Sequence, residues 1–330
     1  YYTRDEMVDM IAYAKARGVT MIPFTSPHLD TKSFPDIFSG FALGDRLLQD
    51  CPEFWQATDR KISLLCDLYK DAPYIHLGAM AGEAAHFGAN DTQRAFMAKH
   101  GIRDSNEYYI WLTERMRSSV RKHGKTCLIW EGVRPCDSNI PLSKDVIICA
   151  YSMHYYLPTE AMRDEYSLIN CSWLPLYSVQ AQNNLSPRAD TIYSWDIGRF
   201  QHRLPDSPAY QLPPDAPILK GAQLCIWEET YESVMPDLRL RAAAFSERTW
   251  NPDAGKTFEH LEVRRIATDS LLRRMVYPLQ LHTLGEDEAG DPQFADSVTV
   301  ACRSTLPGSI RYDLADDWNS FPSPRSPRYT

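Results

Sequence analysis

Residues 73–88 read PYIHLGAMAGEAAHFG and decide the fold that we expect for this chain of 330 residues. Residues 74–77 are apolar enough to form a short buried strand, which Gly78-Ala79 ends. A loop of small residues follows and carries one carboxylate, Glu83, before helical sequence resumes beyond Asn90. A single acidic residue on a loop after a buried strand is typical of the edge where an α/β barrel keeps its reacting groups. The stretch therefore predicts a barrel strand whose loop presents Glu83.

Strand-like runs recur along the chain and alternate with helical sequence. Besides residues 74–77, the predicted strands are residues 19–23 (VTMIP), 125–130 (KTCLIW), 145–150 (DVIICA), 168–171 (LINC) and 218–226 (ILKGAQLCI). The predicted helices are residues 4–17, behind a capping box of Thr3 and Glu6, then 59–69, 105–123, 159–166, 239–250 and 258–275. This alternation predicts an α/β fold with a parallel sheet, a (β/α)8 barrel of the TIM type. Such a barrel has eight strands and only six are visible, so we expect the first two to precede Tyr1, which is consistent with a chain that does not begin with Met.

The character of the sequence changes after Pro278. Residues 297–302 (SVTVAC) and 309–314 (SIRYDL) have the pattern of strands, with Gly and Pro turns between them. We therefore predict a barrel domain over residues 1–277 and the start of a small β-rich domain, a β-sandwich, with a loose tail over residues 278–330. Within the barrel domain, the Pro-rich interval 178–217 is too long for a plain connection and predicts a functional loop.

Composition excludes several classes of function. A net charge of −8 without a basic run argues against a nucleic-acid partner. No apolar run approaches the roughly 18 to 20 residues that a membrane span needs. The eight cysteines form no zinc-like spacing and the nine histidines are scattered, so we predict no metal and no cofactor. Cys127, Cys149, Cys171 and Cys225 lie inside apolar runs and are predicted to be buried thiols. Oligomeric state and compartment stay open.

With these elements in place, the sequence resembles the family 20 glycoside hydrolases, the β-N-acetylhexosaminidases. The resemblance covers residues 1–277 and rests on YIHLGAMAGEA (74–84), KTCLIWE (125–131), LINCSWLPLY (168–177), GAQLCIWEE (221–229) and MPDLRLRAAAFSERTWNP (235–252). The last two runs are the most specific. The resemblance implies an exo-acting enzyme that removes terminal β-linked N-acetylhexosamine from a glycan.

The resemblance also implies roles for individual residues. In this family the acetamido oxygen of the substrate attacks its own anomeric carbon, and one glutamate acts first as general acid and then as base. Glu83 matches that glutamate. Tyr177 matches the tyrosine that hydrogen-bonds the acetamido oxygen, Glu229 the glutamate that binds sugar hydroxyls, and His28 the histidine of the third-strand loop.

Aromatic residues at the ends of strands predict the walls of a sugar site, because the C–H groups of a pyranose face pack on rings. Trp130, Trp173 and Trp227 each fall at or just beyond a predicted strand end. Trp227 is the predicted pocket wall. Trp195, in the interval 178–217, is predicted to form the floor of the subsite for the aglycone, the leaving group of the reaction.

One departure from the family pattern opens alternatives. The family has an aspartate before its catalytic glutamate, to orient the acetamido group, but Gly82 stands there in this chain. Three alternatives follow. In the first, the chain is an active hexosaminidase in which another carboxylate, that of Asp91 or Glu131, takes the place of the missing aspartate. Alternatively, it is a glycosidase for a sugar without the N-acetyl group, with Glu131 as nucleophile, or a non-catalytic relative that binds carbohydrate.

Overall fold

The fold is taken from a computed structural model, which divides the chain into two compact units, Tyr1–Ala254 and Gly255–Thr330. The residues that the structure describes are 2–26, 40, 50–78, 88, 90–179, 188–202, 204, 206–227, 231–251, 257–266, 279–283, 297, 299–304, 310, 312 and 327–328. The division between the units falls earlier than the change in sequence character at Pro278.

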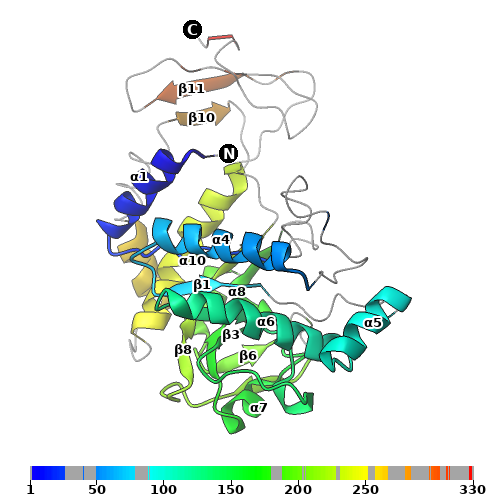
Figure 1. The fold of residues 1–330 in the computed structure, drawn as a ribbon. Coiled ribbons are helices and arrows are strands. Elements are labelled where there is room, and N and C mark those ends of the chain that lie inside the picture. Colours follow the sequence, from blue (N-terminus) through cyan, green and yellow to red (C-terminus); the bar gives the residue numbers. More distant parts are fainter. Residues whose placement is uncertain are drawn as a thin grey trace. The chain divides into compact units, whose positions relative to one another are not determined.

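Five parallel strands form the sheet of the first unit (Figure 1). In spatial order they are β1 (Tyr74–His76), β2 (Thr126–Trp130), β3 (Ile147–Ala150), β4 (Ser167–Asn170) and β8 (Leu219–Ala222). Beside β1, the chain at residues 23–25 forms a single parallel bridge, Phe24 with His76, where the sequence predicted a full strand over residues 19–23. The predicted α/β class with a parallel sheet is confirmed. The sheet is open over the described strands, since β1 and β8 do not pair.

The predicted strand over residues 218–226 is divided into two. Its first half, β8, pairs with β4, and its second half, β9 (Cys225–Trp227), pairs in parallel with β5 (Tyr177–Val179). The register between β4 and β8 shifts by one residue where Ile169 faces Gly221, and Gly221 has a φ of 145° that favours glycine. This irregularity at Gly221 lets the two halves of the run pair with two different strands.

The helices of the first unit include α1 (Arg4–Lys15), α4 (Pro52–Leu68), α5 (Asp91–His100), α6 (Ser105–Lys122), α7 (Pro158–Arg163) and α10 (Tyr231–Trp250). Of these, α4 and α6 pack against each other and cover one face of the sheet, whereas α10 packs against the short helix α9 (Ala189–Ser194). The capping box before α1 is confirmed, since the backbone N–H of Thr3 donates to the Glu6 carboxylate and that of Glu6 to the Thr3 hydroxyl. Two helices begin earlier than predicted: α4 uses Pro52 in its first turn, where proline is tolerated, and α10 begins before Pro236 rather than after it.

The interval 178–217 is not a plain loop over its described residues. It contains the short helix α9 (Ala189–Ser194) and an antiparallel hairpin of β6 (Arg199–Gln201) with β7 (Ala209–Gln211). The Tyr193 hydroxyl on α9 donates to the Glu247 carboxylate on α10 at 3.2 Å, and the Arg248 guanidinium donates to the Trp195 carbonyl at 3.1 Å. The described part of the interval is therefore packed structure rather than an irregular loop, and its predicted functional role stays a prediction.

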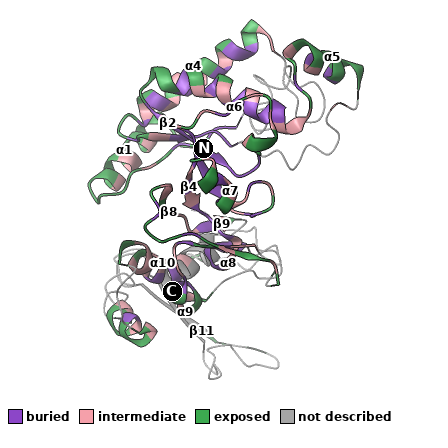
Figure 2. Cartoon of the chain, turned by 90° about the horizontal axis from the view of Figure 1, so that it is seen from below, coloured by how far each residue is buried: buried purple, intermediate pink, exposed green. Residues whose placement is uncertain are grey.

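The two faces of the sheet belong to different cores, because successive side chains of a strand point to opposite faces. Ile129 and Ile148 face α4 and α6 and belong to the larger core, whose buried residues are drawn in purple in Figure 2. Trp130 and Cys149 face the other way, into a smaller core with Cys171 and Tyr177. All four cysteines predicted to be buried are buried and free. The smaller core marks the face on which the site is built.

In the second unit, residues 258–266 are helical, as predicted, and the rest of the helix predicted over residues 258–275 lies outside the described residues. The unit also contains an antiparallel pair, β10 (Leu279–Thr283) with β11 (Val300–Ser304). The predicted strand over residues 297–302 overlaps β11, and β10 was not predicted. Most of residues 309–314 lie outside the described residues. Among the helices described in either unit, none is long and apolar enough to cross a lipid bilayer.

Candidate active site

Aromatic side chains gather where the parallel strands end. His76 is the last residue of β1, Trp130 the last of β2 and Trp227 the last of β9, while Tyr151 directly follows β3 and Tyr177 begins β5. Carboxyl ends of parallel strands meet at one edge of a sheet, and in barrels this edge carries the active site. The sequence spreads these residues over 150 positions, and the topology brings them together.

The rings form one connected group, which we call the ring row; its members are Phe24, His76, Trp130, Tyr151, Trp173, Tyr177 and Trp227. Centroid distances are 5.0 Å for Phe24–His76, 4.8 Å for His76–Trp130, 5.8 Å for Trp130–Tyr151, 6.1 Å for Trp130–Trp227, 6.4 Å for Tyr151–Tyr177 and 4.4 Å for Trp173–Tyr177. These lie in or close to the range of about 4.5 to 7 Å in which aromatic pairs attract. Three of the four tryptophans predicted for the site, Trp130, Trp173 and Trp227, are therefore in one group.

The ring row has a buried floor and an exposed rim. Trp130, Tyr177 and His76 are buried, whereas the side chain of Trp227 is 46% exposed and that of Phe24 is 44% exposed. Large exposed aromatic faces beside a buried aromatic floor are costly in water unless a ligand covers them. A flat molecule with C–H faces and a few polar groups suits this surface.

Tyr177 supplies a polar group within the floor. Its ring stacks on Trp173, and burial, together with the nearby thiols of Cys225 and Cys171, raises the pKa of the phenol far above its ordinary value. A phenol with a raised pKa keeps its proton at neutral pH. Tyr177 is thus a permanent hydrogen-bond donor.

His76 and Gly78 shape the start of the loop that carries Glu83. The backbone N–H of Gly78 donates to Nδ1 of His76 at 3.0 Å, so this histidine ties the loop to the end of β1. Its Nε2 is buried and has no hydrogen-bond partner among the described residues. Gly78 has a φ of 76°, and a Cβ there would meet Ser26 at 3.0 Å. Only glycine fits this close approach.

Glu131 is fully buried and surrounded by donors, which corrects its prediction as a nucleophile or substitute carboxylate. Its two oxygens accept hydrogen bonds from six consecutive backbone N–H groups, those of residues 151–156, and from the Ser152 hydroxyl. All of its accepting capacity is therefore used inside the protein. A nucleophile needs a free lone pair, and Glu131 has none to offer.

Asp91 is also excluded as the substitute carboxylate. It is the first residue of α5, its side chain is 99% exposed, and it pairs with Arg94 one helical turn away. An acidic residue in the first turn of a helix is stabilised there by the helix dipole. Its role is that of an ordinary helix-end residue.

Trp195 lies apart from the ring row. It is 5% exposed, and its indole N–H donates to the backbone carbonyl of Arg199 at 3.0 Å. This placement does not support the predicted floor for a leaving group, because neither ring face is free. The sequence placed Trp195 only in the long interval 178–217, and nothing in its local sequence shows whether its ring is buried.

Three predicted site residues, Glu83, His28 and Glu229, lie outside the described residues. The structure does describe where the segments that carry them leave the sheet: Gly78 after β1, Ser26 beside β1, and Trp227 at the end of β9. Phe24 and Tyr151 were not predicted for the site. The position of Tyr151, directly after the strand over residues 145–150, was the signal available in the sequence.

The described residues contain no group of three or more His, Cys, Asp or Glu side chains that could hold a metal ion. The polar groups that the ring row offers are the Tyr177 and Tyr151 hydroxyls, the His76 ring and the indole N–H groups of its tryptophans. Such a set binds and orients a ligand. Proton transfer requires a further acid from the loops that follow the strands.

The amino-acid sequence matches the family model described as glycosyl hydrolase family 20, catalytic domain, over residues 48–253, which is more than half of the chain. It is 24% identical over 274 residues to the lacto-N-biosidase of Bifidobacterium bifidum, a match that covers 76% of this chain and 24% of that protein. This chain thus spans about a quarter of the length of that relative.

Solved structures show the same fold. A β-N-acetylhexosaminidase from Bacteroides fragilis superposes with a TM-score of 0.67 at 15% identity, covering 84% of this chain and 57% of that one. An exo β-N-acetylglucosaminidase from Vibrio harveyi, solved in complex with N-acetylglucosamine, superposes with a TM-score of 0.60 at 21% identity, covering 82% of this chain and 45% of that one. The chain therefore spans about half of the length of these two proteins.

Proposed function

The chain belongs to glycosyl hydrolase family 20, and from this premise we propose that it is an exo-acting glycoside hydrolase that removes terminal β-linked N-acetylhexosamine from a glycan. The observation that carries the proposal is the ring row at the carboxyl ends of the parallel strands. Its floor holds one permanent donor, Tyr177, and its rim exposes the face of Trp227. A pyranose with an acetamido group matches both features.

The residues would divide the reaction as follows. The sugar ring packs against Trp227 and Trp130, and the Tyr177 hydroxyl donates to the acetamido oxygen and holds it under the anomeric carbon. That oxygen attacks the anomeric carbon while Glu83 protonates the departing glycosidic oxygen; Glu83 then takes a proton from the water that opens the cyclic intermediate. Glu229 and His28 bind the sugar hydroxyls. The configuration at the anomeric carbon is retained because it is inverted twice.

A second candidate is a non-catalytic protein that binds the same sugar. One observation favours it: Gly82 stands where the family has the aspartate that orients the acetamido group. Removal of one such stabilising group typically lowers the rate by about 10² to 10³. Neither Asp91 nor Glu131 replaces the missing carboxylate, for the reasons given above. The ring row serves binding equally well in either candidate.

A substrate panel tests the proposal. We expect the protein to release p-nitrophenol from the β-N-acetylhexosaminides, gluco or galacto, and not from the plain β-glucoside, which lacks the attacking acetamido group. Binding of N-acetylglucosamine, measured by tryptophan fluorescence, is the second readout. Binding without turnover would make the protein a carbohydrate-binding relative. Turnover of the plain glucoside would refute the acetamido mechanism.

Trp227 and Trp195 should behave in opposite ways when each is changed to alanine. Trp227→Ala removes a half-exposed ring from the rim, so we expect little loss of stability but about tenfold weaker binding of N-acetylglucosamine, equivalent to about 1.4 kcal/mol. Trp195→Ala removes a buried ring and should lower the free energy of unfolding by about 3 to 5 kcal/mol, without weakening the binding by folded protein. Urea unfolding and fluorescence titration measure the two quantities. The reverse pattern would assign the sugar to Trp195.

A further inference from the structure

We propose that Glu131 is a positioning residue, which holds the loop of residues 151–156 so that Tyr151 completes the sugar site; this rests on the proposed function. We call these residues the β3 loop, since they directly follow β3. Glu131 directly follows β2, the parallel neighbour of β3. The carboxyl ends of the two strands therefore bring together a carboxylate and a loop that are twenty residues apart in sequence.

Each of the two oxygens of the Glu131 carboxylate accepts backbone hydrogen bonds from one half of the β3 loop. Oε2 accepts from the backbone N–H of Tyr151, Ser152 and Met153, each at 3.0 Å. Oε1 accepts from the N–H of His154 at 2.9 Å, Tyr155 at 3.0 Å and Tyr156 at 3.4 Å, and from the Ser152 hydroxyl at 2.9 Å. Successive N–H groups that converge in this way form an anion-binding concavity. Here the anion is a side chain of the same protein.

The conformation of the β3 loop depends on this carboxylate. Met153 has a φ of 54°, which a residue with a side chain adopts only when its surroundings impose it. Six N–H groups that point inward need an acceptor, because a buried N–H without a partner is unfavourable. Without the Glu131 carboxylate, the loop would have to turn these groups toward water. Its first residue, Tyr151, would move with it.

Tyr151 connects the β3 loop to the ring row. Its ring lies 5.8 Å from that of Trp130 and 6.4 Å from that of Tyr177, and it is partly buried between them. Tyr177 is the proposed donor to the acetamido group, so a displaced Tyr151 changes the wall beside that donor. Glu131 itself is fully buried and would not touch the substrate. Any effect of Glu131 on binding is therefore indirect, and the loop that its carboxylate holds begins with Tyr151 of the ring row.

A double-mutant cycle tests this dependence. Glu131→Gln replaces one carboxylate oxygen by an NH₂ group, which cannot accept from the three N–H groups that face it. We expect Glu131→Gln to weaken the binding of N-acetylglucosamine at least tenfold. Tyr151→Ala should weaken it similarly, and the double variant no further than Tyr151→Ala alone, because residues that act through one another are not additive. The proposal fails if the two effects multiply.

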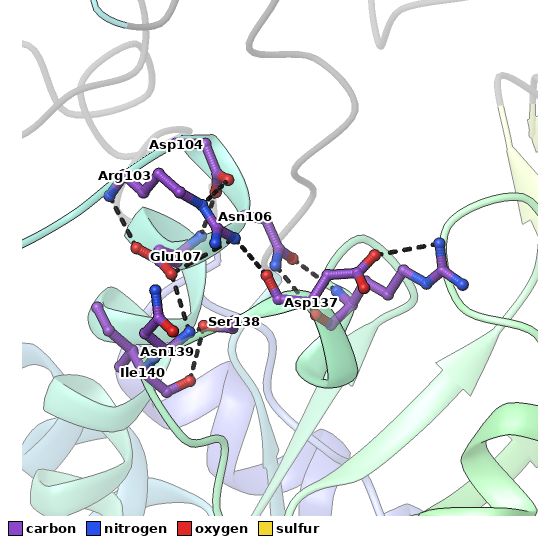
Figure 3. A network of polar contacts seen from close by, with 9 residues as sticks. Arg103, Asp104, Asn106, Glu107, Asp137, Ser138, Asn139 and Ile140 are labelled. Carbon is purple, nitrogen blue, oxygen red and sulfur yellow. Dashed lines mark hydrogen bonds and ion pairs between the residues drawn. The ribbon is translucent and has the colours of Figure 1, made fainter.

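Glu107→Gln is the matched control. Glu107 is also a fully buried glutamate whose oxygens accept backbone N–H groups, from Arg103 at 2.8 Å and Asn139 at 2.9 Å, as Figure 3 shows. Its partners in these hydrogen bonds, Arg103 and Asn139, do not belong to the ring row. We expect Glu107→Gln to lower stability without weakening sugar binding. If Glu107→Gln weakened the binding of N-acetylglucosamine as much as Glu131→Gln does, the loss would be a general effect of placing an amide at a buried position. That result would overturn the proposal.

A readout without sugar separates this proposal from the proposed function. Chymotrypsin cleaves after tyrosine, and the β3 loop contains Tyr151, Tyr155 and Tyr156. We expect folded Glu131→Gln to be cut within residues 151–156 at least tenfold faster than the unchanged protein or Glu107→Gln. If the unchanged protein neither binds nor cleaves the sugar, the proposed function fails while this arm still tests the loop. Equal cleavage rates would refute the positioning role. If Glu131→Gln does not fold, Ser152→Ala, which removes one donor to the same carboxylate, takes its place with the same expected direction.

Discussion

Glu83→Gln should reduce the release of a sugar leaving group by about 10² to 10⁴, the usual contribution of a general acid or base. The amide keeps the size of the side chain but can neither give a proton to the glycosidic oxygen nor take one from water. The loss should be smaller with p-nitrophenol than with a sugar as leaving group, because a phenolate leaves with little help from an acid. We expect the binding of N-acetylglucosamine to change by less than about threefold, a small effect on the free-energy scale.

The measurement compares two substrates of the same N-acetylhexosamine, one with a p-nitrophenyl and one with a sugar leaving group. Asp91→Asn is the matched control, since Asp91 lies on an exposed helix end and was the other carboxylate near this loop in sequence. It should leave both rates unchanged. Full activity of Glu83→Gln on both substrates would remove Glu83 from the mechanism. Loss of activity in Asp91→Asn would point to a different register for the loop.

Tyr177→Phe is expected to lower the rate on acetamido substrates by about 10² to 10³, the range seen when one transition-state donor is removed. The phenylalanine ring keeps the stack on Trp173 at the same position, so the lost group is the hydroxyl alone. Any slow reaction of a substrate without the acetamido group should not change. The ratio of the two rates is therefore the quantity to measure.

The pH dependence follows from the direction of the Tyr177 pKa. Burial favours the neutral phenol and raises the pKa, so the folded protein holds the proton even where an exposed tyrosine, with a pKa of about 10, begins to lose it. The preference for the acetamido substrate should therefore stay constant up to about pH 9. A preference that falls between neutrality and that pH would mean that the phenol ionises and would contradict the role.

Tyr166→Phe is the matched control for this variant. Tyr166 is buried, donates its hydroxyl to the Leu142 carbonyl at 2.7 Å, and has a pKa that burial raises to about 12. It belongs to the helix-covered core and not to the ring row. Its loss should lower the free energy of unfolding by about 1 kcal/mol and leave the substrate preference unchanged. Equal changes in preference for both variants would assign the effect to stability.

Much of the local structure was predictable because its causes are local. The capping box of Thr3 and Glu6, the helix over residues 105–123 and the strand over residues 125–130 each form nearly where expected. Catalytic domains of this family are TIM barrels, which confirms the predicted fold class. The predictions failed where a distant partner decided the outcome. Residues 218–226 form two strands instead of one, because the first half pairs with β4 and the second half pairs with β5.

By itself, the sequence determined the parallel strands over residues 74–76, 126–130, 147–150 and 167–170, the long helices between them and the family, because periodicity, caps and motif residues are properties of short stretches. Only the tertiary structure decided what Glu131, Trp195 and Trp227 do. A glutamate at the end of a strand has the same local sequence whether it faces a substrate or six N–H groups of the next strand's loop. Two tryptophans likewise differ only in what the chain packs against them. Such roles depend on contacts between residues far apart in sequence, and these contacts exist only after folding.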